Sequence, residues 1–146
     1  MHPHLSTASE ALSWLQANDM RRVELVFADL TSVARGKIMS TASFAETQAA
    51  KMPSLFLGLT VTGGEPPQVF KRIFPPMFPD MAMRPDWSTL VRDPLAGVPS
   101  ATVICDIEAS FTAADGHCQY EVAELSPRQL LKRVLARLKA AGYTAK

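Results

Sequence analysis

The chain has 146 residues, of which 47% are hydrophobic and 20% are charged, a balance that is typical of a globular domain and excludes a disordered one. The net charge of +1 gives the molecule as a whole no attraction for polyanions such as nucleic acids. No apolar run approaches the roughly 20 residues that cross a bilayer, and the N-terminus lacks the basic and apolar regions of a secretory signal. We therefore expect a cytoplasmic protein that binds neither nucleic acid nor membranes.

The two cysteines and three histidines form no metal-ligand pattern. Cys105 sits in an apolar run, which is typical of a small buried side chain, whereas Cys118 sits in a polar loop. In a reducing compartment we expect no disulfide between them. The sequence also lacks a phosphate-binding glycine loop and the common nucleophile–base motifs. Residue chemistry alone thus predicts neither a metal site nor a catalytic site.

Two short helices are predicted in the first third of the chain. The first runs from about Thr7 to Asn18, because Ser6 or Thr7 can cap it and Glu10 stands near its first turn. The second runs from Thr41 to Ala50, with Ser40 or Thr41 as its cap.

A β-hairpin is predicted between these helices. Apolar residues alternate along the segment 23–28, the turn-forming residues 29–32 follow, and an extended pattern resumes over 33–39. Gly36 inside the second strand suggests a bulge or the close approach of another backbone. Arg35 and Lys37 point to the same side of that strand, where most such pairs are solvated.

The segment SLFLGLTVT, residues 54–62, is predicted to be a third strand because it is rich in β-forming residues. Its end runs into Gly63 and Gly64, which could bind an anion through backbone amides but more often form a simple turn. Residues 63–80 then carry five of the eleven prolines together with many apolar side chains. A loop this long and this apolar is usually functional or covered by a partner.

The remaining strands are predicted at Met81–Arg84, Thr89–Arg92 and Ser100–Glu108, the last being the clearest of all. Residues 109–125 are interpreted as a linker that contains a turn at Asp115-Gly116.

The last predicted element is an amphipathic helix that begins at Ser126 as N-cap, with Pro127 in the first helical position, and ends near Gly142. From Ser126 onward the chain has six basic residues and no acidic one. The apolar residues fall on one arc and the basic residues on the other; the apolar arc consists of Leu130, Leu131, Val134, Leu135, Leu138 and Ala141, and the basic arc of Arg128, Lys132, Arg133, Arg137 and Lys139.

Three interpretations of this helix stay open. It could be an ordinary surface helix with a solvated basic face, or a helix that packs on a further domain. It could also be a basic helix for nucleic acid or a membrane surface, although the stacking aromatics that would favour nucleic acid are nearly absent.

Mingled strands and helices without regular β-α-β alternation predict an α+β fold, with a mixed sheet packed by a helix. The order of hairpin, helix and further strands is that of a β-grasp, or ubiquitin-like, unit. We expect an N-terminal helix in residues 1–19, a β-grasp domain in 20–108, a linker in 109–125 and a separate helix in 126–146.

Four phrases together resemble the glutamine synthetase family. VELVFADLTSVARGKIM is similar to the early hairpin of these ligases, and MFPDMAMRPDWSTL to a segment with the pattern Asp-Met-x-x-x-Pro-Asp-x-x-Thr. ATVICDIE is similar to the strand after it, and SPRQLLKRVLARLKAAGY to the helix that opens the family's catalytic domain. The Arg-Gly-Lys form resembles the γ-glutamyl-amine ligase branch, such as γ-glutamylputrescine ligase, more than housekeeping glutamine synthetase.

The resemblance implies an ATP-dependent glutamate–ammonia or glutamate–amine ligase that assembles as a homo-oligomeric ring. It implies that this chain is the N-terminal β-grasp domain plus the first helix of a truncated catalytic domain, inactive alone and without cofactors of its own. ATP and Mg²⁺ or Mn²⁺ would be bound by the full-length protein, and the missing catalytic domain would be the partner.

The resemblance also implies that a loop of this domain lies over the active site of a neighbouring subunit, where an Asp often binds the ammonium. The corresponding loop would be GLTVTGG, with Thr60, Thr62, Gly63 and Gly64 as candidate amine-site residues and Thr60 at the acid's position. Candidate subunit-interface residues are Arg35, Lys37, Phe70, Phe74 and Phe78. The alternative is a stand-alone β-grasp interaction module that docks a partner through its apolar proline loop.

Overall fold

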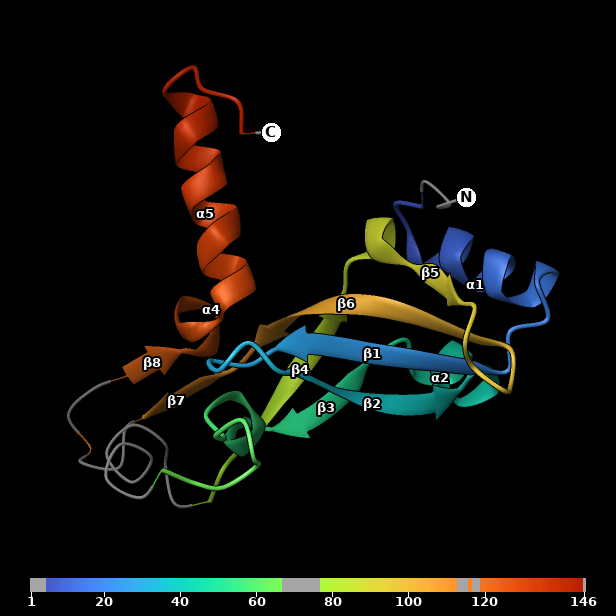
Figure 1. The fold of residues 1–146 in the computed structure, drawn as a ribbon, viewed down its shortest axis with the longest axis horizontal. Coiled ribbons are helices and arrows are strands. Elements are labelled where there is room, and N and C mark those ends of the chain that lie inside the picture. Colours follow the sequence, from blue (N-terminus) through green and yellow to red (C-terminus); the bar gives the residue numbers. More distant parts are fainter. Residues whose placement is uncertain (1–4, 67–76, 113–115, 117–118, 146) are drawn as a thin grey trace.

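The computed structural model describes residues 5–66, 77–112, 116 and 119–145, and Figure 1 gives their arrangement. The fold is α+β, with a mixed and mostly antiparallel sheet and helices packed against it, as the sequence predicts. None of the helices in these ranges has the length and apolar character needed to cross a membrane.

The N-terminal helix α1 (Ala8–Ala17) begins as expected. Thr7 Oγ1 accepts a hydrogen bond from the Glu10 amide at 3.2 Å, and the Glu10 carboxylate accepts one from the Thr7 amide at 3.0 Å. This reciprocal pair satisfies two amides that the first turn leaves without helical partners. Ala11 and Leu15 then bury the inner side of the helix in the core.

The predicted hairpin is confirmed as β1 (Arg22–Ala28) paired antiparallel with β2 (Ala34–Ser40). The register is unbroken from Arg22 opposite Ser40 to Ala28 opposite Ala34, so Gly36 does not mark a bulge. Instead, a Cβ atom at Gly36 would lie 2.3 Å from the Leu25 carbonyl oxygen, which is the close backbone approach that the glycine suggested.

Helix α2 (Thr41–Thr47) is capped by Ser40 and buries Phe44. The ring centroids of Phe44 and Trp87 lie 5.8 Å apart in an edge-on arrangement. Strand β3 (Ala50–Pro53) follows, and the short 3-10 helix η1 (Ser54–Leu57) comes next. The third strand predicted at residues 54–62 is therefore wrong. Strand β3 ends at Pro53, and the apolar run beyond it buries Leu57 and Leu59 from a helical turn and a loop instead of alternating across a sheet.

The centre of the sheet is β6 (Ser100–Glu108), which has the predicted bounds. Its parallel neighbour on one side is β1. On the other side it pairs antiparallel with β4 (Asp80–Pro85) over its second half and with β5 (Val91–Asp93) over its first half, and η2 (Trp87–Thr89) connects those two strands. The strand order is β2-β1-β6-β4-β3.

One face of this sheet is the core. Alternate residues of β1, β4 and β6 are buried there against α1 and α2. The opposite face holds the intervening residues of β6, among them Thr102, Ile104 and Asp106.

The segment 109–125 is more structured than a linker. It contains β7 (Ser110–Thr112), which pairs with β8 (Gln119–Glu121), and the short helix α4 (Val122–Leu125). Phe111 and Val122 are buried in the same core as the sheet. The domain limits proposed on either side of this segment stay a prediction.

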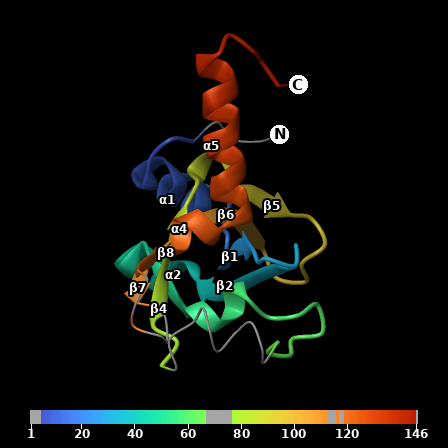
Figure 2. The same cartoon turned by 90° about the vertical axis from the view of Figure 1, so that its left-hand side faces the viewer.

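Helix α5 (Pro127–Ala140) confirms the predicted start and end. Ser126 Oγ accepts a hydrogen bond from the Gln129 amide, and Pro127 stands in the first turn. At the other end Gly142 has a positive φ of 84°, and the Gly142 and Tyr143 amides bond the carbonyls of Lys139 and Leu138, both at 3.0 Å. That pairing is the glycine-dependent helix stop known as a Schellman motif. In both Figure 1 and Figure 2, α5 projects away from the sheet.

The close approach at Gly36 predicts a strong stability effect. We expect Gly36→Ala to lower the free energy of unfolding by about 1–3 kcal/mol, because the added methyl must displace the backbone of β1. Urea unfolding of the chain measures this change. Gly97→Ala is the matched control, since a Cβ there meets nothing within 4 Å, and its effect should stay within about 0.5 kcal/mol. Equal stabilities for the two variants would contradict the prediction.

Candidate functional site

The turn between β1 and β2 is organised by one buried carboxylate, that of Asp29. Its Oδ1 atom accepts hydrogen bonds from the Thr31 amide at 2.8 Å, the Thr31 hydroxyl at 2.9 Å and the Val33 amide at 2.8 Å. Ser32, in the middle of the turn, has a positive φ of 65°. An Asp at the start of such a turn satisfies amides that would otherwise lack partners.

Arg35 completes this cluster and links it to a second segment. Its Nε donates to Asp29 Oδ2 at 2.8 Å, and its Nη2 donates to the Thr60 carbonyl oxygen at 2.9 Å. The side chain is only 17% exposed. Arg35 therefore bonds within its own chain, unlike a solvated strand residue, whereas Lys37 is exposed two residues further along β2.

Two opposing effects act on the pKa of Asp29. Burial alone would raise the pKa of this carboxyl, but the hydrogen bonds from Arg35, Val33 and Thr31 outweigh burial and hold the pKa below its ordinary value. Asp29 is thus an ionised anchor of the turn.

The candidate amine-site loop closes on itself. The Thr60 amide donates to the Gly64 carbonyl at 2.8 Å, and the Gly63 amide donates to the Thr60 carbonyl at 2.9 Å. Thr60 Oγ1 accepts from the Gly64 amide at 2.9 Å and lies 3.2 Å from Thr62 Oγ1. Gly63 has a positive φ of 82°, which suits glycine. The structure thus brings all four predicted loop residues into one compact turn.

The predicted interface residues do not all lie in the described part of the chain. Phe70 and Phe74 fall outside the described residues. Phe78 lies half-buried against the core with a positive φ of 42°. The role of these residues at a subunit interface stays a prediction.

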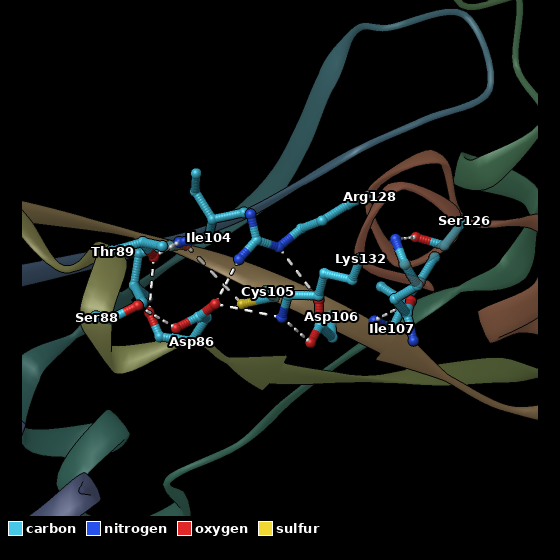
Figure 3. A network of polar contacts seen from close by, with 12 residues as sticks. Asp86, Ser88, Thr89, Ile104, Cys105, Asp106, Ile107, Ser126, Arg128 and Lys132 are labelled. Atoms are coloured by element: carbon cyan, nitrogen blue, oxygen red, sulfur yellow. Dashed lines mark hydrogen bonds and ion pairs between the residues drawn. The ribbon is translucent and has the colours of Figure 1, made fainter. Parts of the chain in front are cut away.

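A second polar cluster joins α5 to the sheet, and Figure 3 shows it with Arg128 between two carboxylates. The Arg128 guanidinium donates from Nη2 to Asp86 and from Nε to Asp106, the latter at 3.2 Å. The Nζ atom of Lys132, one helical turn further on, lies 2.7 Å from an Asp106 carboxylate oxygen and 3.3 Å from one of Asp86. We call these four residues the α5 clamp.

The α5 clamp is supported by the segment between β4 and β5. Ser88 Oγ donates to Asp86 at 2.6 Å, and Thr89 Oγ1 accepts from the Ile104 amide at 2.9 Å. Gln129 adds a further link to the sheet, since its side-chain oxygen accepts from the Ile107 amide at 3.1 Å. Polar contacts therefore tie the first turn of α5 to β6.

Burial alone would raise the pKa of Asp86. The hydrogen bonds from Ser88 and Lys132, together with the charges of Lys132 and Arg128, outweigh burial and lower it.

The apolar side of α5 is exposed. None of the α5 residues is buried. Leu131 and Leu130 are 57% and 51% exposed, and the other large apolar residues of the same arc, Val134, Leu135 and Leu138, are exposed as well. An apolar strip of this length on one helix is typical of a surface that another protein segment covers. Of the three interpretations of the helix, this exposure favours packing on a further domain.

The sequence did not identify the α5 clamp. Its pattern indicates a turn residue at Asp86 and a solvated face at Arg128 and Lys132. The one signal that could have found the cluster is the outward-facing Asp106 of β6, since an acid in the middle of a central strand needs a basic partner.

Cys105 is buried as predicted, and burial raises the pKa of its thiol to about 12, which excludes a reactive thiolate. Cys118 falls outside the described residues. In the ranges that the structure describes, no group of three or more His, Cys, Asp or Glu side chains is placed to hold a metal ion.

No protein-family model and no curated protein sequence matches the chain. Solved structures do match. A GmaS–ADP complex aligns with a TM-score of 0.66 at 19% identity, over 94% of this chain and 26% of that one. GmaS without ligand aligns at 0.65, with 18% identity, over 94% and 27%. The glutamine synthetase of Plasmodium falciparum aligns at 0.63, with 16% identity, over 96% and 24%.

These structural neighbours are glutamine synthetase-family chains, and at this level of identity the likeness shows a shared fold. The chain spans about a quarter of the length of each of them.

The lowered pKa of Asp86 predicts how the α5 clamp responds to pH. A carboxyl whose pKa is lower in the folded state stabilises the protein fully above its unfolded-state value, 3.8, and loses that effect as the pH falls through the folded-state value. Near neutral pH, the free energy of unfolding of Asp86→Asn should therefore be about 1–2 kcal/mol lower than that of the wild type. This difference should shrink as the pH falls from about 5 to about 2.

Urea unfolding at a series of pH values measures the difference, and Asp93→Asn serves as the control because Asp93 caps a neighbouring turn without a cationic partner among the described residues. A difference that stays constant down to the lowest pH would show that the charge of Asp86 contributes nothing.

Proposed function

We propose that this chain is the N-terminal β-grasp domain of a glutamine synthetase-family ligase that joins glutamate to ammonia or to an amine. The observation that carries the proposal is the combination of fold and length: glutamine synthetase-family chains align over nearly the whole chain, while the chain accounts for about a quarter of their length. The Arg-Gly-Lys sequence of β2 favours the γ-glutamyl-amine ligase branch.

The exposed apolar strip of α5 supports a domain packed on the far side of this helix. The α5 clamp holds the start of the helix on the sheet, and the strip formed by Leu130, Leu131, Val134, Leu135 and Leu138 is exposed. Basic residues flank the strip, and Arg137 and Lys139 have no ion-pair partner among the described residues. We propose that the catalytic domain covers the strip and supplies acidic groups at its edge.

The ligase reaction has two steps in this proposal. ATP phosphorylates the γ-carboxylate of glutamate, and the nitrogen of ammonia or an amine then attacks the acyl phosphate and releases phosphate. Mg²⁺ or Mn²⁺ bound by the catalytic domain would neutralise the phosphoryl charge. The described residues of this chain do not fit such a metal site, so we assign the metals and ATP to the catalytic domain.

The contribution of this domain would be positional. The loop Thr60–Gly64 would lie over the active site of a neighbouring subunit in a cytoplasmic homo-oligomeric ring. Its hydroxyl groups and backbone would border the site where the amine enters. By itself the domain would hold no nucleotide and would catalyse no reaction.

The proposal predicts activity only when the catalytic domain is present. The protein expressed with its downstream coding region should release phosphate from ATP in a manner that depends on both glutamate and an amine. A panel of amines in this assay identifies the acceptor. The 146-residue chain alone should show no binding of ATP with magnesium in calorimetry. Tight nucleotide binding by the chain alone would contradict the proposal, and a stop codon directly after Lys146 would favour the interaction module instead.

The apolar strip of α5 gives an independent test. Leu131→Gln with Leu138→Gln should change the free energy of unfolding of this chain by less than about 0.5 kcal/mol, because both side chains are exposed. In the protein that carries the catalytic domain, the same pair should lower stability by about 2 kcal/mol or more, since it places polar groups in a buried contact. Thermal and urea unfolding of both forms measure this contrast. Ala136→Gln, an exposed residue on the opposite side of α5, is the control and should be neutral in both. If the double variant is neutral in the longer protein, the proposal that the catalytic domain covers the apolar strip is wrong.

A further inference from the structure

We propose that Arg35 is a positioning residue that fixes the backbone of the loop Thr60–Gly64 and thereby sets the affinity of the enzyme for its amine. The inference rests on the proposed function for the identity of the site, whereas the positioning itself follows from contacts inside this chain.

Two hydrogen bonds and one longer polar contact join the hairpin turn to the loop and the segment just before it. The Leu30 amide donates to the Leu57 carbonyl at 2.9 Å. The Thr31 hydroxyl lies 3.3 Å from the Leu59 carbonyl, and Arg35 Nη2 donates to the Thr60 carbonyl at 2.9 Å. Both hydrogen bonds end on carbonyl oxygens, so they fix the course of the backbone independently of the loop's side chains.

Of these bonds, the one from Arg35 reaches furthest into the loop. The Thr60 carbonyl that it contacts also accepts the Gly63 amide, so a single oxygen joins the closed turn to the sheet. Leu59 is buried just before this point, whereas the chain is exposed over Val61–Glu65, and Val61 is 68% exposed. Among the described residues, no other hydrogen bond joins this turn to the hairpin, so the Arg35 contact is the direct link between them.

An arginine suits this role better than a lysine. The planar guanidinium places Nε on Asp29 and Nη2 on Thr60 at the same time, and its position is fixed by the fully buried carboxylate. A lysine ammonium could keep the ion pair with Asp29 but has no second, rigidly oriented nitrogen for the Thr60 carbonyl. Arg35→Lys therefore removes the link to the loop while it retains the charge that the buried Asp29 requires.

Hydrogen exchange of the chain tests the positioning directly. In Arg35→Lys, the amides of Thr60, Gly63 and Gly64 should exchange about tenfold faster relative to the amides of β6 than in the wild type. The ratio to β6 separates a loosened loop from a destabilised fold, because global unfolding accelerates both. Arg92→Lys, on the exposed face of β5, is the matched control and should leave the ratio unchanged. An unchanged ratio in Arg35→Lys would overturn the proposal.

Steady-state kinetics of the protein with its catalytic domain test the consequence. Arg35→Lys should raise KM for the amine about tenfold, whereas KM for glutamate and for ATP should stay close to wild type. A loss of stability alone would lower the amount of active enzyme without separating these constants. A loosened loop with an unchanged amine KM would overturn the link between Arg35 and the amine. Absence of ligase activity in the wild-type protein would instead refute the proposed function, and the exchange ratio would still decide whether Arg35 positions the loop.

Discussion

The orientation of α5 depends on one guanidinium held between two carboxylates. Arg128 contacts Asp86 and Asp106, which come from different segments of the sheet region, and Lys132 strengthens the same pair of contacts one turn later. These partners lie at the start of an amphipathic helix, and its large apolar residues are exposed on the part that projects from the sheet. In most globular domains the apolar side of a helix packs on the core. In this helix the large apolar residues are instead exposed.

The two polar clusters of the molecule share a physical logic. In each, an arginine joins elements that are distant in sequence through charge-assisted hydrogen bonds: Arg35 joins the hairpin to the loop, and Arg128 joins α5 to the sheet. Partly buried ion pairs of this kind add little net stability, because desolvation offsets much of the attraction. Their directional geometry instead selects one orientation of the attached element. Both attached elements, the loop and the apolar strip, are exposed in this chain.

The correct predictions from the sequence rest on local chemistry. The cap at Thr7, the glycine stop at Gly142 and the strand at Ser100–Glu108 each follow from a few neighbouring residues, and the structure confirms them. The prediction of a strand at residues 54–62 was wrong because a short apolar stretch fits a strand and a packed turn equally well. The partners of Arg128 were not identified, since Asp106 and Asp86 lie 22 and 42 residues away in sequence and local patterns do not pair them. The role of Arg35 was missed for the same reason, because Thr60 lies 25 residues away.

The chemistry of the loop follows from its charges. Thr60–Gly64 contains no carboxylate, and the positive charge of Arg35 beside it is balanced by Asp29. Thr60 Oγ1 already accepts a hydrogen bond from the Gly64 amide, so much of its capacity is used inside the loop. At the proposed amine site such a loop could shape the entrance and offer hydroxyl contacts, but it could not balance the charge of an ammonium ion. In the proposed enzyme, a group outside these five residues, such as the exposed Glu65 that follows them or another element, would supply that charge, or the acceptor would enter as a neutral amine. In both cases the contribution of the loop depends on where its backbone lies, which is the property that the Arg35 contact controls.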